Sequence, residues 1–581
     1  MLDTQPARPL RRTLVVVASL LALRILPPPA AAAPAQEASL ILTGARVWTG
    51  DSERPWASAV AIAGERLLAV GDSGEALVHK GPATRVLDLP GRFVVPGFID
   101  DHTHFDRAGT LILGVNLLDV ADEAALVGRV REARDRLPPG SPIVGGDWGA
   151  YEAWQLGSAG GAAQPAKAPF LPHRSMIDPL TPDNPVLLAK WDRSLYLANA
   201  RALGAAGAGC QWPGVECDAA GSPTGRLAPE AGRRVEAVLP RKSLEQRLAE
   251  GRAALAQLAS FGVSGIHDVT TPEQMAAFQE LRRRGELTVR VYARPTLDRV
   301  EHLTALGIGP GFGDEWLAVG GLKGFVDGIM GNSTARFYEP YLTSGARGSW
   351  RAMMEPPGNM ERLLRLADAA GFSPQVHAIG DEAVDTLLDL YERVISAGAP
   401  RERRWRVIHA QVLRGPEVAN RMARLGVIAE VQPYHAIDDM RWMEERIGPR
   451  ARWAYAFKTL RDAGVRLGFG SDWPGTNASW YPADPILGIY AAVTRKTLDG
   501  KPEAGWFPEE RVDLETALGA YTVNNAWAAG EEAQKGSLAA GKLADLAVLD
   551  RDPFAIPPDA LKKVKVLLTV VGGRVVFERL R

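Results

Sequence analysis

Between residues 244 and 474 the sequence alternates short apolar runs with amphipathic stretches of helical periodicity. The apolar runs include "VSGIHDV", "TVRVYARP", "GGLKGFVDG", "SPQVHAIGD", "RWRVIHAQV", "VIAEVQP" and "VRLGFGSDWP", and "EAVDTLLDLYERVISAG" is one of the stretches between them. A repeated strand and helix predicts a parallel sheet with helical crossovers. The number of repeats favours an α/β fold closed into a (β/α)8 TIM barrel. A doubly wound open sheet is the alternative, but no Gly-x-Gly-x-x-Gly turn opens a helix beside a strand here.

The two ends of the chain contain short β-like runs without the helical stretches found in the middle. Residues 36–95 contain "SLILTGARVWTG" and "ASAVAIAGERLLAVG", and residues 531–581 contain "ADLAVLD" and "VKVLLTVVGGRVVFE". Such short β-runs separated by Gly, Asp and Pro predict strands. We therefore expect both ends to form one small β-sandwich domain beside a barrel of residues 96–530.

The N-terminal segment has the pattern of an export signal. Arg8, Arg11 and Arg12 precede the apolar run "TLVVVASLLAL", which "RILPPPAAAAPAQ" follows. A positive region, a short apolar region and small residues predict a signal peptide over residues 1–35, cleaved or kept as an anchor. A disordered tail is the alternative. We expect a periplasmic or secreted protein that contacts the membrane only through this segment.

Charge and cysteine content narrow the classes of partner and compartment. The chain has 67 Lys and Arg against 68 Asp and Glu, a formal net charge of -1. Binding of nucleic acid needs a clustered basic excess, so we expect a small-molecule substrate and no nucleic acid. A homodimer is compatible with this composition. Cys210 and Cys217 in "CQWPGVEC" could form a disulfide in an oxidising compartment, and two free thiols are the alternative.

Two of the nine histidines lie together at the end of the apolar run in "VVPGFIDDHTHF". Residues two apart share a face of a strand, so His102 and His104 point the same way. Two imidazoles on one face at the carboxyl end of a strand suit a divalent metal. A pair of structural histidines is the alternative.

Other strand ends carry residues of the same chemistry. His377 ends "SPQVH", His409 ends "RWRVIH", and Asp472 follows "LGFGS". Lys323 lies within the apolar run "GGLKGFVDG", where an isolated ammonium is costly to bury. Because the carboxyl ends of barrel strands meet at one mouth, these residues predict a shared metal site.

Several longer motifs link these residues to a known family: "PGFIDDHTH", "TPDNPVLL", "GLKGFVDGIMG", "VHAIGD", "RVIHAQ", "GFGSDWP", "AYTVNNA" and "GSLAAGKLADLAVLD". From about residue 40 to its end the chain resembles the amidohydrolase superfamily. Within it, the chain is similar to amidohydrolase family 3, the group that includes N-substituted formamide deformylases. In two places the sequence departs from the family pattern: it has Asp192, Arg193 and Ser194 after "TPDNPV", and Asn332 and Ser333 after "GIMG".

The resemblance implies a centre of one or two divalent metals. Zinc is expected, with Fe, Mn or Co as alternatives, and the implied ligands are His102, His104, Lys323, His377, His409 and Asp472. Lys323 would be carboxylated and would bridge two metals. If a single metal is bound, Lys323 would instead be a pocket cation or the partner of an acid.

The same resemblance suggests roles in catalysis and in substrate binding. Asp472 would move a proton, and His435 in "VQPYHA" would stabilise an oxyanion or bind substrate. A solvent-exposed loop histidine is the alternative for His435. The expected substrate-binding residues are Asp147, Trp148, Trp191, Ser194 and Trp473. Core packing explains the tryptophans equally well.

These observations predict an exported amidohydrolase that cleaves a carbon–nitrogen bond of an amide, formamide or cyclic amide with a metal-activated hydroxide. An esterase or lactonase on the same metal site is one alternative. A non-catalytic exported binding protein on the barrel is another. The sequence leaves the natural substrate open.

Overall fold

A computed structural model describes residue 1 and residues 36–149, 170–476 and 479–580 of the chain. The predicted signal peptide therefore lies, apart from Met1, outside the described residues. Residues from 37 onward form one compact unit. Within the described ranges, every helix is too short or too polar to cross a bilayer.

Among the described residues, eight parallel strands close into a barrel. Neighbouring strands pair in parallel register, and the ring is completed by parallel bridges from Thr103 to Trp473 and from Thr296 to Lys323. The predicted TIM barrel is confirmed. Its strands are β8 (Phe98–Thr103), β14 (Val263–Val269), β15 (Arg290–Arg294), β18 (Leu322–Phe325), β19 (Pro374–Ala378), β20 (Arg406–His409), β21 (Ile428–Val431) and β22 (Leu467–Phe469).

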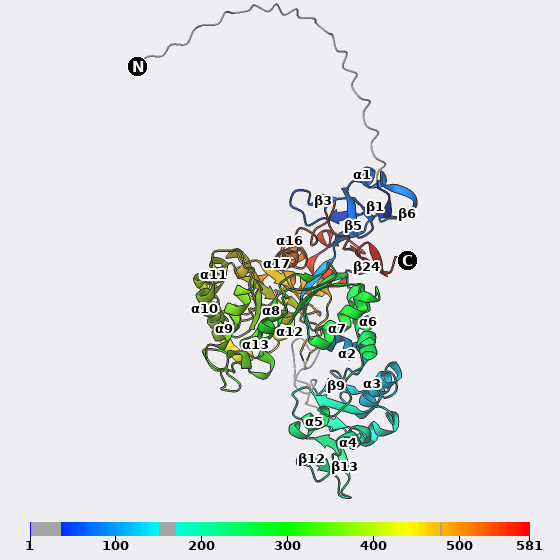
Figure 1. Cartoon of the computed structure of the whole chain (residues 1–581), viewed down its shortest axis with the longest axis vertical. Helices are drawn as coiled ribbons and strands as arrows, with labels where there is room; N and C mark the ends of the chain where they lie inside the picture. The colour runs from blue at the N-terminus through cyan, green and yellow to red at the C-terminus, as the bar shows by residue number, and fades with distance from the viewer. Residues whose placement is uncertain (2–35, 150–169, 477–478, 581) are drawn as a thin grey trace, which may run out of the picture. The chain divides into compact units, whose positions relative to one another are not determined.

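Helices follow the barrel strands and cover them from outside. Helix α10 (Asp381–Ala397) shows the cause, because its apolar residues recur at three- and four-residue spacing and are buried: Val384, Leu387, Leu388 and Tyr391. Acidic Asp381 and Glu382 in its first turn complement the helix dipole, and Gly398 ends it. Helix α10 packs against α9 (Asn359–Ala369) and α11 (Pro416–Leu425), which are drawn beside it in Figure 1.

The remaining helices complete the layer around the barrel and its C-terminal side. They are α2 (Phe105–Leu113), α6 (Leu244–Ser260), α7 (Pro272–Arg283), α8 (Val300–Ala305), α12 (Pro433–Asp439), α13 (Met443–Ile447), α14 (Phe457–Asp462), α15 (Pro485–Thr494), α16 (Leu514–Ala520) and α17 (Val523–Ala529). A short hairpin of β16 (Phe312–Gly313) and β17 (Leu317–Val319) adds to the edge of β15.

An insertion interrupts the first strand–helix unit of the barrel, between α2 and α6. Its five-stranded sheet has the order β12–β13–β11–β10–β9, a feature that the sequence analysis did not predict. The strands are β9 (Ile143–Trp148), β10 (Val186–Lys190), β11 (Tyr196–Ala198), β12 (Val215–Cys217) and β13 (Pro223–Leu227). The helices α3 (Glu123–Arg136), α4 (Ala200–Ala206) and α5 (Pro229–Glu236) accompany them.

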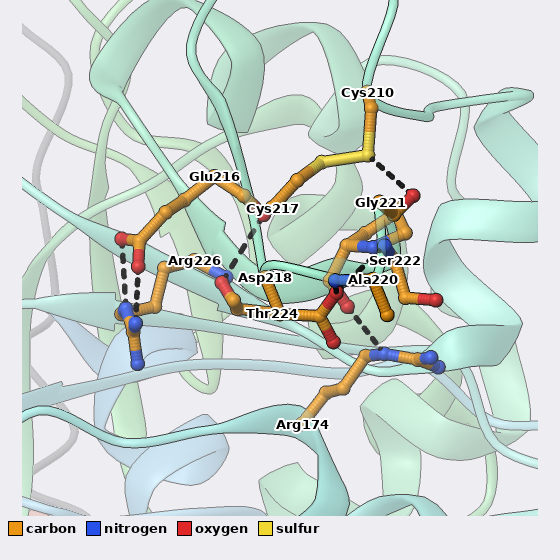
Figure 2. The surroundings of a disulfide bond; sticks show 11 residues. Arg174, Cys210, Glu216, Cys217, Asp218, Ala220, Gly221, Ser222, Thr224 and Arg226 are labelled. Carbon is orange, nitrogen blue, oxygen red and sulfur yellow. Dashed lines mark hydrogen bonds and ion pairs between the residues drawn. A yellow bond between two sulfur atoms is a disulfide. The ribbon is translucent and has the colours of Figure 1, made fainter.

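Within the insertion, Cys210 and Cys217 form a disulfide with Cα atoms 6.0 Å apart. Figure 2 shows the turn that follows it, where the Asp218 carboxylate accepts the backbone N–H groups of Ala220 and Ser222, both at 2.9 Å. Glu216 forms an ion pair with Arg226 across β12 and β13. The disulfide therefore closes a small loop at the edge of the insertion sheet.

The two ends of the chain share a sheet. The order β25–β24–β23–β7–β2–β3 combines strands from residues 46–96 with strands from residues 546–578, and a second sheet has the order β5–β4–β1–β6. Leu42, Val60, Val94, Leu546 and Val570 belong to one buried apolar cluster. A separate β-sandwich domain and its boundaries stay predictions. The strands and the one helix are β1 (Ala38–Thr43), β2 (Arg46–Trp48), β3 (Trp56–Ala57), β4 (Ala59–Ala63), β5 (Arg66–Gly71), α1 (Ser73–Leu77), β6 (Lys80–Asp88), β7 (Phe93–Pro96), β23 (Leu546–Leu549), β24 (Val566–Val571) and β25 (Arg574–Glu578).

We expect the double variant Cys210→Ser/Cys217→Ser to lower the local stability of the β12–β13 edge by up to about 2 kcal/mol, because the disulfide restricts a short loop in the opened state. Hydrogen exchange of the β12 and β13 amides measures this change, with the β19 and β20 amides as an internal control. Unchanged protection at β12 and β13, or an equal loss in the barrel strands, would contradict this expectation.

Candidate metal centre and active site

The carboxyl ends of the barrel strands open into a cavity of about 710 Å³. Seven of the residues considered in the sequence analysis line it together: His102, His104, Lys323, His377, His409, His435 and Asp472. They come from six different strand ends, as parallel strands that share one edge require. Two groups have ligand atoms within 4.8 Å of one another, namely His102, His104 and Asp472, and His409, His435 and Asp472.

Asp472 is common to both groups. Its Oδ1 lies 3.0 Å from His104 Nε2 and 3.4 Å from His102 Nε2, while its Oδ2 lies 3.8 Å from His435 Nε2. Asp472 follows β22 in a left-handed backbone conformation with φ 57°. Its N–H donates to the His102 carbonyl at 2.8 Å, which ties it to the neighbouring strand. Strained conformations of this kind persist where the surrounding structure holds them, and they cluster at functional sites.

The hydrogen bonds of His377 and His409 indicate which ring nitrogen faces the centre. His409 Nδ1 lies 2.7 Å from Gln432 Oε1, and His377 Nε2 lies 2.8 Å from the Gly328 carbonyl. Each of these acceptors requires an N–H, so the proton is assigned to that nitrogen. His409 Nε2 and His377 Nδ1 are then left with lone pairs, and the two rings lie 4.6 Å apart between centroids. Partners of this kind fix a metal-binding tautomer.

The charge states of the buried groups suit a divalent metal. Burial lowers the pKa of His102 and of His409 well below the ordinary value, which keeps both imidazoles neutral. Burial alone would raise the pKa of Asp472, but the His104 hydrogen bond and the neighbouring imidazoles hold it well below its ordinary value. Neutral imidazoles and an ionised carboxylate are ligands that zinc and related metals use.

Lys323 lies beside this centre, with its Nζ 3.3 Å from His102 Nε2. Burial, with a contribution from the Arg294 charge, lowers the pKa of Lys323 to about 7. No ion pair to Lys323 is found among the described residues. His435 Nε2 is also buried and has no hydrogen bond within the described part of the chain; Asp472 Oδ2 lies 3.8 Å from it. Both nitrogens face the space that a metal would fill, so the residues present fit such a group.

The cavity also has a mainly apolar wall of aromatic, methionine and isoleucine side chains: Trp191, Phe325, Ile329, Met330, Met353, Trp442 and Tyr481. Tyr481 packs against His435 with ring centroids 4.1 Å apart. Arginine side chains also line the wall, among them Arg107 and Arg193.

The five expected substrate-binding residues occupy different places. Trp191 lines the cavity, and Asp147 lies buried behind the wall, 3.0 Å from Arg107 and 2.9 Å from Arg193. Ser194 is exposed and donates to Asp192 at 2.6 Å. Trp148 and Trp473 are buried in two separate apolar clusters, away from the cavity lining. A role of these five residues in binding substrate stays a prediction.

Several buried polar residues that support the centre were not predicted from the sequence. Glu430, Arg294 and Arg406 lie beneath it, and their side chains have no exposed surface. The available signal was a charged residue inside each of the apolar runs "VIAEVQP", "TVRVYARP" and "RWRVIHAQV". A fourth residue, Asp327, accepts backbone N–H groups from Arg336, Ile379 and Gly380, which fixes the loop after the His377 strand.

Comparisons with known proteins agree with this geometry. A model of the amidohydrolase family matches residues 85–577. Protein LONG AFTER FAR-RED 3 of Arabidopsis thaliana is 32% identical over 93% of this chain and 92% of its own length. N-substituted formamide deformylase of Arthrobacter pascens is 28% identical over 94% of this chain and 99% of its own.

A solved structure supports the same relationship. An uncharacterized metal-dependent hydrolase from Pyrococcus furiosus superposes with a TM-score of 0.70 and 28% identity, covering 88% of this chain and 99% of its own. The family match extends over most of the chain and includes every strand of the barrel. The chain therefore belongs to the amidohydrolase family, and it is a metal-dependent hydrolase of carbon–nitrogen bonds.

Proposed function

We propose that the protein is an exported hydrolase that cleaves the carbon–nitrogen bond of an amide, formamide or cyclic amide with one or two zinc ions. The observation that carries this proposal is the arrangement around Asp472, where imidazoles from separate strand ends surround one ionised carboxylate. Such a site suits the hydrolysis of a stable amide at neutral pH, because water alone is a poor nucleophile and a bound metal activates it.

His102, His104 and Asp472 would hold one metal, and His377 and His409 would hold a second. A divalent metal at this site, when bound, polarises a carbonyl group and activates water. Nitrogen and carboxylate-oxygen ligands suit zinc. Lys323 would be carboxylated, which forms a bond between Nζ and carbon dioxide, releases a proton and converts the side chain to an anion. Its burial without an ion pair among the described residues supports this assignment.

The chain's own side chains would then handle the proton and the substrate. Asp472 is ionised and close to three imidazoles, so it can accept a proton from the attacking water and deliver it to the leaving nitrogen. His435 faces the same space and can hydrogen-bond to the oxygen on which negative charge develops. The aromatic wall that includes Trp191 and Trp442 would exclude water and hold an apolar substituent of the amide.

Two features support export. The N-terminal 35 residues have the composition of a signal peptide. The insertion contains a disulfide, and stable disulfides are typical of proteins outside the cytosol.

We expect His102→Ala to abolish metal binding at the His102–His104–Asp472 group and to lower activity by more than about 100-fold, since it removes a ligand and not only a supporting contact. Metal content, activity and the thermal midpoint of unfolding would be measured on the same preparation. His302→Ala, at an exposed position of α8, serves as the control and keeps metal and activity. Retained turnover in His102→Ala would remove this residue from the mechanism.

We expect N-substituted formamides with an apolar substituent to be hydrolysed faster than aryl esters of similar size, because the cavity combines a proton donor for a leaving nitrogen with an apolar wall. Initial rates for both substrate types, measured with the same metal-loaded protein, provide the test. Ester turnover that is faster by orders of magnitude would favour the esterase or lactonase alternative, and no turnover with full metal loading would favour a binding protein.

A further inference from the structure

Glu430 is buried at the bottom of the metal centre and does not line the cavity. It projects from β21 and meets Arg294 from β15 and Arg406 from β20 inside the barrel. Arg294 Nη1 donates to Glu430 Oε1 at 2.7 Å, and Arg406 Nη1 donates to Oε2 at 3.0 Å. An ionised carboxylate without access to water needs such partners, because a buried charge without an opposite charge and hydrogen-bond donors is costly.

His102 touches this group through the nitrogen that faces away from the cavity. His102 Nδ1 lies 2.9 Å from Glu430 Oε1, and its Nε2 lies 3.3 Å from Lys323 Nζ and 3.4 Å from Asp472 Oδ1. The imidazole and the Glu430 carboxylate are both fully buried, so no water competes for this contact. The ring is therefore held between the Glu430 carboxylate below and the proposed metal position above.

The Glu430 carboxylate and the proposed metal position favour the same tautomer of His102. Arg294 Nη2 carries two N–H groups; one donates to the His267 carbonyl at 2.6 Å, and Nη2 also lies 2.9 Å from His102 Nδ1. If Nδ1 accepted from Arg294, the His102 proton would sit on Nε2 and point at the Lys323 amine. If Nδ1 donates to Glu430, the Nε2 lone pair faces Lys323 and the metal position. The second arrangement pairs the His102 N–H with the buried Glu430 carboxylate, whereas the first would place the Nδ1 lone pair against that anion. Only the second leaves Nε2 free to bind a metal.

We propose that Glu430 is a positioning residue that holds His102 in the Nδ1–H form and orients its Nε2 toward the metal, with Arg294 and Arg406 holding Glu430 in place. This inference rests on the metal-dependent function proposed above. Among the ligand candidates His102, His377 and His409, His102 has the shortest contact to a carboxylate through the nitrogen that faces away from the cavity, 2.9 Å to Glu430. His409 faces the Gln432 amide, and His377 Nε2 lies 2.8 Å from the Gly328 carbonyl and 3.4 Å from Asp327 Oδ1. Charge-assisted hydrogen bonds are stronger than neutral ones, so the His102 site depends most on its partner.

The test uses the full-length protein loaded with zinc or with Co²⁺. We expect Glu430→Gln to weaken metal affinity by about 10- to 100-fold, the range typical for partners of metal-binding histidines. Affinity is measured by competition with a chelator. The visible absorption spectrum of the Co²⁺ form should also shift, because the orientation of a ligand changes; a purely structural role would leave that spectrum unaltered.

A matched control separates this effect from general destabilisation. Asp545 is a buried carboxylate that accepts a hydrogen bond from Arg290 Nε at 2.7 Å, and it is not among the residues that line the cavity. Asp545→Asn should lower the thermal midpoint of unfolding and leave metal affinity and the Co²⁺ spectrum as in the wild type. If Glu430→Gln does not fold, Glu430→Asp keeps the charge for both arginines but withdraws the oxygen from His102 Nδ1, and it should still weaken metal binding by about 10-fold.

Two outcomes are distinguishable from each other. Wild-type affinity and an unchanged Co²⁺ spectrum in the folded Glu430 variants would overturn the positioning role while leaving the metal-dependent function intact. A wild-type protein that binds no metal, in contrast, would overturn the proposed function itself.

Discussion

The structure depends on one shared carboxylate, that of Asp472, being placed among imidazoles that arrive from different strands. The barrel closes where β22 meets β8, and there the Asp472 backbone hydrogen-bonds to His102. The residue adopts a left-handed conformation and keeps its charge although only a small part of its side chain is exposed. Because His102 and His409 are neutral, the Asp472 carboxylate is the anionic group that both sets of candidate ligands share. The residue that closes the ring therefore also supplies the charge that a divalent metal needs at this site.

Much of this arrangement could be predicted from the sequence because it follows from periodicity. Strand and helix patterns alternate, and the carboxyl ends of parallel strands meet at one edge, so His377, His409 and Asp472 had to lie near His102. The Glu430 network was harder to predict. Its three charged residues were visible within apolar runs, but their pairing depends on which strands are neighbours across the barrel interior.

The insertion and the residues that bind substrate were the hardest parts to predict from the sequence. Residues 114–243 also contain short apolar runs and helical stretches, so the pattern does not distinguish an inserted mixed sheet from further barrel units. The tryptophans illustrate the same difficulty: Trp191 lines the cavity, whereas Trp148 and Trp473 pack into apolar clusters. Only the direction of each side chain decides between these environments, and irregular strand register near the site makes that direction unreadable from spacing alone.

The most direct measurement is anomalous diffraction across the zinc absorption edge from crystals of the zinc-loaded protein. The account predicts one or two anomalous peaks at the cavity floor, one of them about 2.0–2.2 Å from His102 Nε2, from a nitrogen of His104 and from an Asp472 oxygen. Imidazoles that point to unrelated places, or a zinc peak bound elsewhere with this group empty, would contradict it.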